Sequence, residues 1–151
     1  MDSIRQNRNN LREGFTLIEI LLSLALVTLL TAISVPFYQS FQQANELDAT
    51  KETILSALRT AKTYARESKD NANWGVYIST ENVVLFQGDS YTTRDPSYDL
   101  YYSISSKVSL YGSTEFVFNT PFGSPTSTGT IGLAINNKSD SILVNEKSVL
   151  P

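Results

Sequence analysis

The sequence has neither cysteine nor histidine among its 151 residues. The absence of cysteine excludes disulfide bonds and thiolate chemistry, and the absence of histidine removes imidazole bases and the commonest zinc and copper ligand. No pair of acidic residues stands in a convincing context for a carboxylate hydrolase. We therefore expect no enzymatic activity, no metal and no cofactor, and a core that is stabilised by packing alone.

The chain also has no large excess of charge of either sign, because its 12 basic and 15 acidic residues leave a net charge of −3. This balance argues against a protein whose main task is to neutralise phosphates. At this length the chain holds one ordinary domain with room for an appendage.

A long apolar run dominates the N-terminal part of the chain. From Leu17 to Phe37 it is interrupted only by Glu19 and a few hydroxyl groups. A helix over residues 15–37 is about 34 Å long at about 1.5 Å per residue, which is enough to cross the hydrocarbon core of a bilayer. The sequence therefore predicts a transmembrane helix here.

Basic residues lie on one side of this run. Arg5, Arg8 and Arg12 precede it, and no basic residue follows it until Lys51. The positive-inside rule then predicts that residues 1–14 lie in the cytoplasm and that the rest of the chain lies outside.

Two ordinary explanations of the run are incomplete. A cleaved secretory signal needs a small-residue cleavage site after its apolar core, and Ala32-Ile33-Ser34 is a poor one. An uncleaved signal anchor explains the charge bias but not Glu19, since an unpaired charge in a membrane span costs at least about 2.5 kcal/mol. Glu19 therefore needs a partner.

The residues before Glu19 suggest that partner. Gly14-Phe15-Thr16-Leu17-Ile18-Glu19 resembles the prepilin peptidase site of type IV pilins and type II secretion pseudopilins. The resemblance implies cleavage after Gly14 and methylation of the new amino group of Phe15. It also implies that Glu19 is the glutamate that this family carries in the first turns of the mature helix.

The physical chemistry of the motif leaves two roles open for Glu19. Cleavage makes Phe15 an α-amine, and Glu19 lies four residues further on, one turn along the same helix face. The carboxylate can compensate this amine in its own chain, where an acid is also favoured by the helix dipole, or in a neighbouring subunit. The family precedent favours the pairing between subunits during assembly.

Pro36 falls where the same family has a proline. It has no N–H to donate to the carbonyl of Ala32, so we expect a helix kink at this position. The kink either marks the place where the helix leaves the membrane or is a weak point that unfolds during assembly. Thr28 stands where many pilins have a helix-weakening glycine.

Beyond the membrane span we expect the helix to continue as an amphipathic segment over residues 38–71. Apolar residues recur there at helical spacing, and the polar residues 68–71 predict its end. The predicted apolar stripe consists of Phe37, Phe41, Ala44, Leu47, Ile54, Leu58, Ala61 and Ala65.

The sequence of residues 72–151 predicts a β-sheet domain. We expect this domain to lie outside the cytoplasm, in the extracellular space or the periplasm. The predicted strands are Trp74–Thr80, Asn82–Gln87, Tyr101–Ser105, Val108–Tyr111, Glu115–Asn119, Thr130–Asn136 and Ile142–Val144. A unit of this size is marginally stable without disulfides or metals, so it should pack on the helix. The expected fold is α+β, a long N-terminal transmembrane and amphipathic helix packed against a C-terminal antiparallel β-sheet. The order of elements resembles minor pilins and H-type pseudopilins.

The polar loop from Gly88 to Tyr98 contains two combinations that also occur in binding sites. Aromatic and basic side chains there can stack on single-stranded nucleic acid, and carboxylates can bind calcium. The aromatic and basic set is Tyr91, Arg94, Tyr98, Tyr101 and Tyr102, and the acidic set is Asp89, Asp95 and Asp99. The acids are interleaved with the arginine, and their spacing fits no standard calcium loop. We therefore expect a solvated loop that binds neither nucleic acid nor metal.

The function expected from the sequence is structural. The chain is a prepilin-like subunit, a minor pilin or pseudopilin, that is assembled into a type IV pilus or a type II secretion pseudopilus. Its expected partners are the prepilin peptidase, other pilin or pseudopilin subunits, the inner-membrane assembly platform and the membrane. The alternative is a membrane-anchored exported binding module, an adhesin or DNA-uptake receptor, that does not polymerise.

Overall fold

The computed structural model describes residues 14–146 and 149–150. The arginines on which the predicted orientation depends, at positions 5, 8 and 12, lie outside these residues. The chain forms two compact units, Met1–Gln39 and Ser40–Pro151, which are described separately below. One helix, α1 (Leu17–Arg66, 50 residues), contributes to both units.

In the first unit, α1 is apolar and exposed. The described side chains from Leu17 to residue 34 are all exposed, although nearly all of them are hydrophobic. Among the described residues, α1 is the helix that is long and apolar enough to cross a membrane. The predicted apolar N-terminal helix is thus confirmed.

The few hydroxyl groups of this segment are satisfied within the helix. Thr28, Thr31 and Ser34 donate to the backbone carbonyls of Ala25, Val27 and Leu30 at 2.9, 2.7 and 2.9 Å. Such back-bonding leaves little polar surface to a hydrocarbon environment. At Thr28, the hydroxyl therefore adds no unsatisfied polar group to the apolar run.

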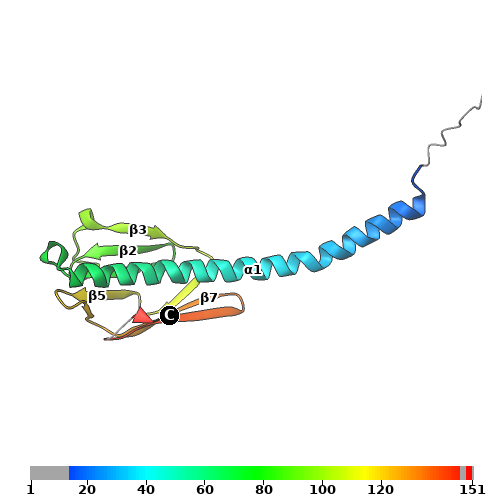
Figure 1. Cartoon of the computed structure of the whole chain (residues 1–151). Coiled ribbons are helices and arrows are strands. Elements are labelled where there is room, and N and C mark those ends of the chain that lie inside the picture. Colours follow the sequence, from blue (N-terminus) through cyan, green and yellow to red (C-terminus); the bar gives the residue numbers. More distant parts are fainter. Residues whose placement is uncertain (1–13, 147–148, 151) are drawn as a thin grey trace, which may run out of the picture. The chain divides into compact units, whose positions relative to one another are not determined.

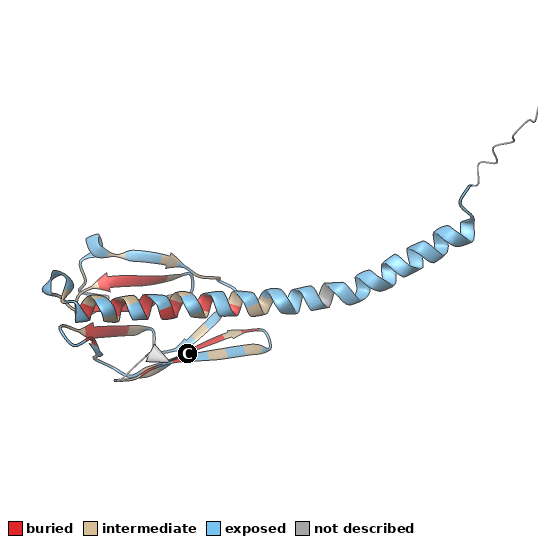
Figure 2. Ribbon diagram, viewed as in Figure 1, coloured by how far each residue is buried: buried red, intermediate tan, exposed pale blue. Residues whose placement is uncertain are grey.

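In the second unit, one face of α1 is buried in the core, as the red segments of the helix in Figure 2 show. The buried hydrophobic residues are Leu47, Ile54, Leu55, Ala57, Leu58, Ala61 and Ala65, and Thr50 is buried beside them. At the start of the predicted apolar stripe, Phe41 is 60% exposed. Leu47 is the first buried residue of α1 in this unit. The helix ends at Arg66, and the short 3₁₀ helix η1 (Lys69–Asn71) follows it.

Two antiparallel sheets surround this part of α1. In Figure 1, β2 and β3 appear on one side of the helix and β5 and β7 on the other. The five-stranded sheet has the order β3 (Leu100–Ser103), β2 (Asn82–Gln87), β1 (Trp74–Ile78), β5 (Glu115–Asn119) and β6 (Ser124–Pro125). The four-stranded sheet has the order β4 (Ser109–Gly112), β7 (Gly129–Ile135), β8 (Lys138–Val144) and β9 (Val149–Leu150). The expected α+β fold is confirmed.

The core lies between α1 and the inner faces of the two sheets. Trp74 anchors one end of it, since its indole Nε1 donates to the carbonyl of Lys69 at 3.1 Å and its ring packs edge-on against Tyr64. Gly75 allows Phe86 on the paired strand to lie across β1, because a Cβ at Gly75 would stand 2.3 Å from the ring. The strands β1 and β2 are buried on both faces, so the outer face of the sheet is also covered at these two strands.

Charged pairs attach α1 to the other sheet and its neighbouring loop. Lys51 Nζ lies 2.7 Å from Asp140 Oδ2 on β8, and Lys107 Nζ lies 2.8 Å from Glu46 Oε1. The hydrogen bond from Lys51 lowers the pKa of Asp140, and that from Lys107 lowers the pKa of Glu46. Both carboxylates are therefore more stable in their charged form.

Candidate functional site

The predicted cleavage site lies just before the first turn of α1. Gly14 and Phe15 precede the helix, which begins at Leu17. Phe15 is 80% exposed, and a Cβ added to Gly14 would meet no atom within 4 Å. The Gly14–Phe15 peptide bond is thus outside the hydrogen-bonded helix and open to an enzyme.

Thr16 caps the helix at this point, a role that our reading of the sequence missed. Its hydroxyl accepts from the backbone N–H of Glu19 at 3.3 Å, and its carbonyl accepts from the N–H groups of Glu19 and Ile20. Thr16 followed three positions later by Glu19 is the pattern of a capping box, and this pattern could have identified the helix start.

Glu19 lies in the first turn of α1 and is exposed. Among the residues that the structure describes, its carboxylate makes no ion pair or hydrogen bond, although its backbone N–H is satisfied by Thr16. A carboxylate with no partner among the described residues is available to pair with a cationic group. The site therefore combines an accessible peptide bond, a capped helix start and one available negative charge.

Pro36 lies within the helix, but the structure does not describe its side chain. The expected kink at this position therefore stays a prediction.

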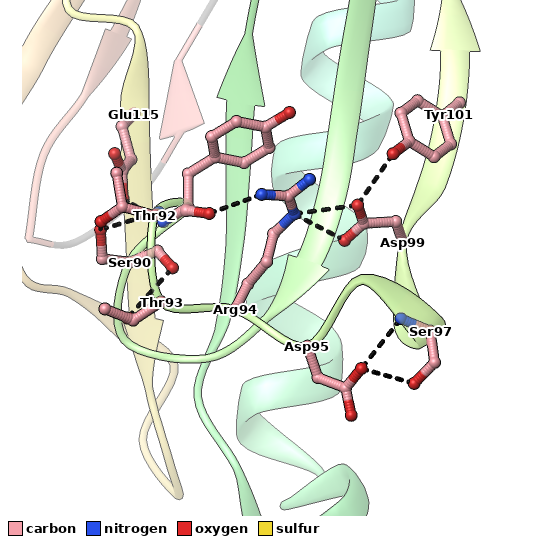
Figure 3. Close-up of polar contacts among 10 residues, drawn as sticks. Ser90, Thr92, Thr93, Arg94, Asp95, Ser97, Asp99, Tyr101 and Glu115 are labelled. Carbon is pink, nitrogen blue, oxygen red and sulfur yellow. Dashed lines mark hydrogen bonds and ion pairs between the residues drawn. The ribbon is translucent and has the colours of Figure 1, made fainter.

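The second candidate, the loop between β2 and β3, folds onto the outer face of the five-stranded sheet. Arg94 is its centre (Figure 3): Nε lies 3.0 and 2.9 Å from the two carboxylate oxygens of Asp99, and Nη1 donates to the carbonyl of Tyr91 at 2.6 Å. The Tyr101 hydroxyl donates to Asp99 at 2.9 Å. The bond to Asp99 raises the pKa of Arg94 above its ordinary value.

Tyr91 has no free face for a nucleotide base. Its ring stacks on Tyr77 with the centroids 3.9 Å apart, and the Arg94 guanidinium lies over it at 3.7 Å. Its backbone N–H donates to Glu115 on β5, and its ring edge meets Phe86. Tyr91 and Arg94 therefore cover the sheet and are not a stacking platform for nucleic acid.

The three aspartates of this loop each have a partner of their own. Asn73 donates to Asp89 at 2.6 Å, Ser97 donates twice to Asp95, and Arg94 holds Asp99. The bond from the Ser97 hydroxyl lowers the pKa of Asp95. In the described part of the chain, no group of three acidic side chains converges in the way that a cation site requires.

The Arg94–Asp99 pair makes a testable prediction. The Asp99 side chain is fully buried and that of Arg94 is 17% exposed, so Asp99→Asn leaves a nearly buried guanidinium without its counter-charge. We expect a clear fall in the Tm of a fragment of residues 40–151. The control is Asp95→Asn, which alters an exposed turn and should change Tm little. Equal Tm values for the two variants would contradict the assigned role of the pair.

The comparisons with known proteins agree with the first candidate site. A family model described as the prokaryotic N-terminal methylation motif matches residues 9–35. The matched range includes Gly14, Phe15 and Glu19 and ends just before Pro36. Comparisons with curated proteins and with solved structures give no match.

The methylation motif and the apolar helix together support a single-pass membrane anchor. The motif implies processing by prepilin peptidase and assembly with other pilins. The sequence match and the geometry thus support a type IV pilin-like precursor, within the superfamily of pilins and pseudopilins.

Proposed function

We propose that this chain is a minor pilin or pseudopilin, a structural subunit of a type IV pilus or a type II secretion pseudopilus. The observation that carries the proposal is the exposed apolar segment of α1, which lies within the matched methylation motif. Exposed apolar surface of this extent needs a lipid or protein environment. A subunit that moves from a membrane into a filament core has such an environment at both stages.

The processing step of the proposal concerns Gly14 and Phe15. Prepilin peptidase cuts between them and methylates the Phe15 amine. Residues 1–14 are then the cytoplasmic leader peptide and residues 15–37 the transmembrane helix. Residues 38–71 continue this helix outside the membrane, and residues 72–151 form the extracellular or periplasmic domain.

The assembly step concerns Glu19. Its carboxylate makes no ion pair or hydrogen bond among the described residues, which supports a role for it outside its own chain. We propose that it pairs with the Phe15 amine of a neighbouring subunit as the inner-membrane assembly platform extracts the chain. A charge pair formed in this way removes the cost of placing a lone amine in the apolar core.

The order of elements in the second unit supports a minor pilin or an H-type pseudopilin over a major pilin. The helix is followed by a strand that begins at Trp74, and the strand Glu115–Asn119 runs into Pro121-Phe122-Gly123. The chain also lacks the cysteines with which many major pilins close a C-terminal disulfide.

Gly14→Val tests the processing step. The structure has open space around Gly14, so valine should not disturb the fold. Cleavage should nevertheless be blocked, because a peptidase needs close approach to the backbone at this position. The measurement is a gel shift of the full chain in its own host, with Thr28→Val as a control that should be cleaved normally. Normal cleavage of Gly14→Val would overturn the assigned site.

A further inference from the structure

The hairpin of β7 and β8 has its tip beside the first turn of α1 in the second unit (Figure 1). Its turn consists of Asn136 and Asn137, and Asn136 has a φ of 50°, which asparagine adopts more readily than most residues. Lys138, the first residue of β8, donates through Nζ to the backbone carbonyl of Ser40 at 2.8 Å, although the two residues are 98 positions apart. The hairpin tip is therefore held at the residue with which the second unit begins.

Ser40 follows the end of the predicted membrane span closely. The span ends at Phe37, and α1 continues through both residues. At about 1.5 Å per residue, their separation is about 4.5 Å along the helix, and even an extended chain would place them no more than about 11 Å apart. The headgroup layer adds roughly 5–8 Å to each side of the hydrocarbon core. The ammonium of Lys138 is therefore within reach of the lipid headgroups in an anchored chain.

Lys138 is a cation without a carboxylate partner among the residues that the structure describes. Its ammonium has the Ser40 carbonyl as its partner there, which leaves further N–H donors for an acceptor outside the chain. By contrast, Lys51 and Lys107 each form an ion pair within the second unit. Asp48, an exposed acid of α1, follows Ser40 by eight residues, or about 12 Å along the helix. The hairpin tip is therefore positively charged where it is nearest to the span.

Phe41 adds an apolar group beside this charge. Its side chain is 60% exposed, whereas the other large hydrophobic residues of α1 described in the second unit are buried or half-buried. The residues that follow it, Gln42 and Gln43, are polar and uncharged. An exposed aromatic ring next to a lysine is typical of protein surfaces that lie at the boundary between headgroups and acyl chains.

We propose that Phe41 and the tip of the β7–β8 hairpin form a docking surface for the phospholipid headgroups of the membrane that α1 spans. The Lys138 ammonium donates to a headgroup phosphate while it keeps the Ser40 carbonyl, and the Phe41 ring enters the boundary with the acyl chains. The inference rests on the single-pass membrane anchor and needs no contact between copies of the chain. Lipid is the occupant because the surface adjoins the membrane span, and because one ring and one cation are too small for a stable protein interface.

The anchor makes a weak contact sufficient. A lysine near an anionic bilayer shifts a binding equilibrium roughly fivefold, which is little for a protein that arrives from solution. Here α1 already holds the domain at the bilayer, so the contact forms within a tethered molecule at a high effective concentration. A fivefold shift then decides whether the domain rests on the headgroups. Within the proposed function, docking belongs to the membrane pool, and extraction of the chain into a filament breaks it.

Fluorescence quenching in bilayers tests the docking. The chain has no cysteine, so full-length Asn137→Cys carries a single fluorophore at the hairpin tip. The labelled chain is reconstituted in bilayers with nitroxide groups on some headgroups, composed of phosphatidylcholine with or without the anionic phosphatidylglycerol. We expect strong quenching that increases with the anionic lipid and decreases with added salt.

Ser127→Cys is the matched control for position. Ser127 is exposed and precedes β7, so it lies at the opposite end of that strand from the hairpin turn. The seven residues of β7 place the two labels about 24 Å apart along the strand. A fluorophore at position 127 should be quenched little in either bilayer.

Variants of Lys138 separate the headgroup contact from the bond to Ser40. In the chain labelled at position 137, Lys138→Ala should remove the effect of anionic lipid and lower the ratio of docked to undocked chains roughly fivefold. Lys138→Arg keeps the charge and should keep the effect. A lysine that only fastened the hairpin to α1 would change the quenching equally in both bilayers. Phe41→Ala should lower the quenching in both bilayers, because it removes an apolar contact and no charge.

The outcomes separate the docking from the anchor on which it rests. Equal quenching at positions 137 and 127, or quenching at 137 that does not depend on lipid charge and salt, would overturn the docking and leave the anchor in place. Relief of quenching by inorganic phosphate, but not by chloride at the same ionic strength, would identify a site for free phosphate and would also overturn it. Failure of the wild-type chain to float with the bilayers would overturn both the anchor and the docking.

Discussion

Glu19→Leu is expected to abolish filament assembly while leaving the anchored and processed monomer intact. The substitution removes a carboxylate from an apolar helix, so the monomer should be at least as stable in the membrane. Cleavage should continue, because Gly14 and Phe15 are unchanged and Thr16 still caps the helix through a backbone N–H. Assembly should fail because the Phe15 amine of an incoming subunit then enters the apolar core without a counter-charge.

The measurement is the ratio of sheared filament to membrane-pool protein for wild type and variant. Thr28→Leu is the control, since it removes a hydroxyl that bonds only to its own helix at Ala25. This control should assemble normally. Equal ratios for wild type and Glu19→Leu would mean that Glu19 serves only its own helix terminus, and the pairing between subunits would have to be abandoned.

Removal of the second half of α1 is expected to make the sheet domain aggregate. A fragment of residues 40–151 should be a soluble monomer with mixed helix and sheet signals, because it corresponds to the second compact unit. A fragment of residues 72–151 loses Ile54, Leu55 and Leu58, which are completely buried, and so exposes the inner faces of both sheets. Size-exclusion chromatography and circular dichroism distinguish the two results.

A point variant tests the same packing without truncation. Leu58→Ala should lower the free energy of unfolding of the 40–151 fragment by about 2–5 kcal/mol, because it leaves a cavity in the core. Ser56→Ala, two residues away on the exposed face, should change the free energy of unfolding by no more than about 0.5 kcal/mol.

One outcome of the truncation experiment would contradict the assigned packing. A stable and monodisperse 72–151 fragment would show that α1 is not part of the core.

Local patterns in the sequence were sufficient for the helix and for several strands. The apolar run and the helical spacing of Leu47, Ile54 and Leu58 predicted α1 and its buried face, and the bounds of β2 and β5 agree with the prediction. These elements depend mainly on residues close together in the chain.

Features that depend on distant contacts were not predictable in the same way. The division of the strands into two sheets follows from pairings such as β4 with β7, which local periodicity does not encode. The exposure of Phe41 depends on where the sheets stop covering the helix. The strands β6 and β9 have two residues each, which is too short for an alternating sequence pattern. The aspartates and tyrosines near Arg94 are of types common in ligand sites, but only tertiary contacts reveal that they fasten a loop to the sheet.

The candidate site also has a part that the sequence could identify and a part that it could not. The residues around Gly14 form a short contiguous motif, so the sequence could identify them, and the Thr16 cap was also present in the pattern. The partner of Glu19 could not be identified in this way. The pairing that we propose joins two chains, and the structure of a single chain contains only one side of that contact.

The intact mass of the mature chain tests the central claim most directly. The account predicts that protein recovered from sheared filaments lacks residues 1–14 and carries one added methyl group on Phe15. An uncut chain in the membrane fraction, with no shortened form in the sheared material, would contradict it and would identify a signal anchor that does not polymerise.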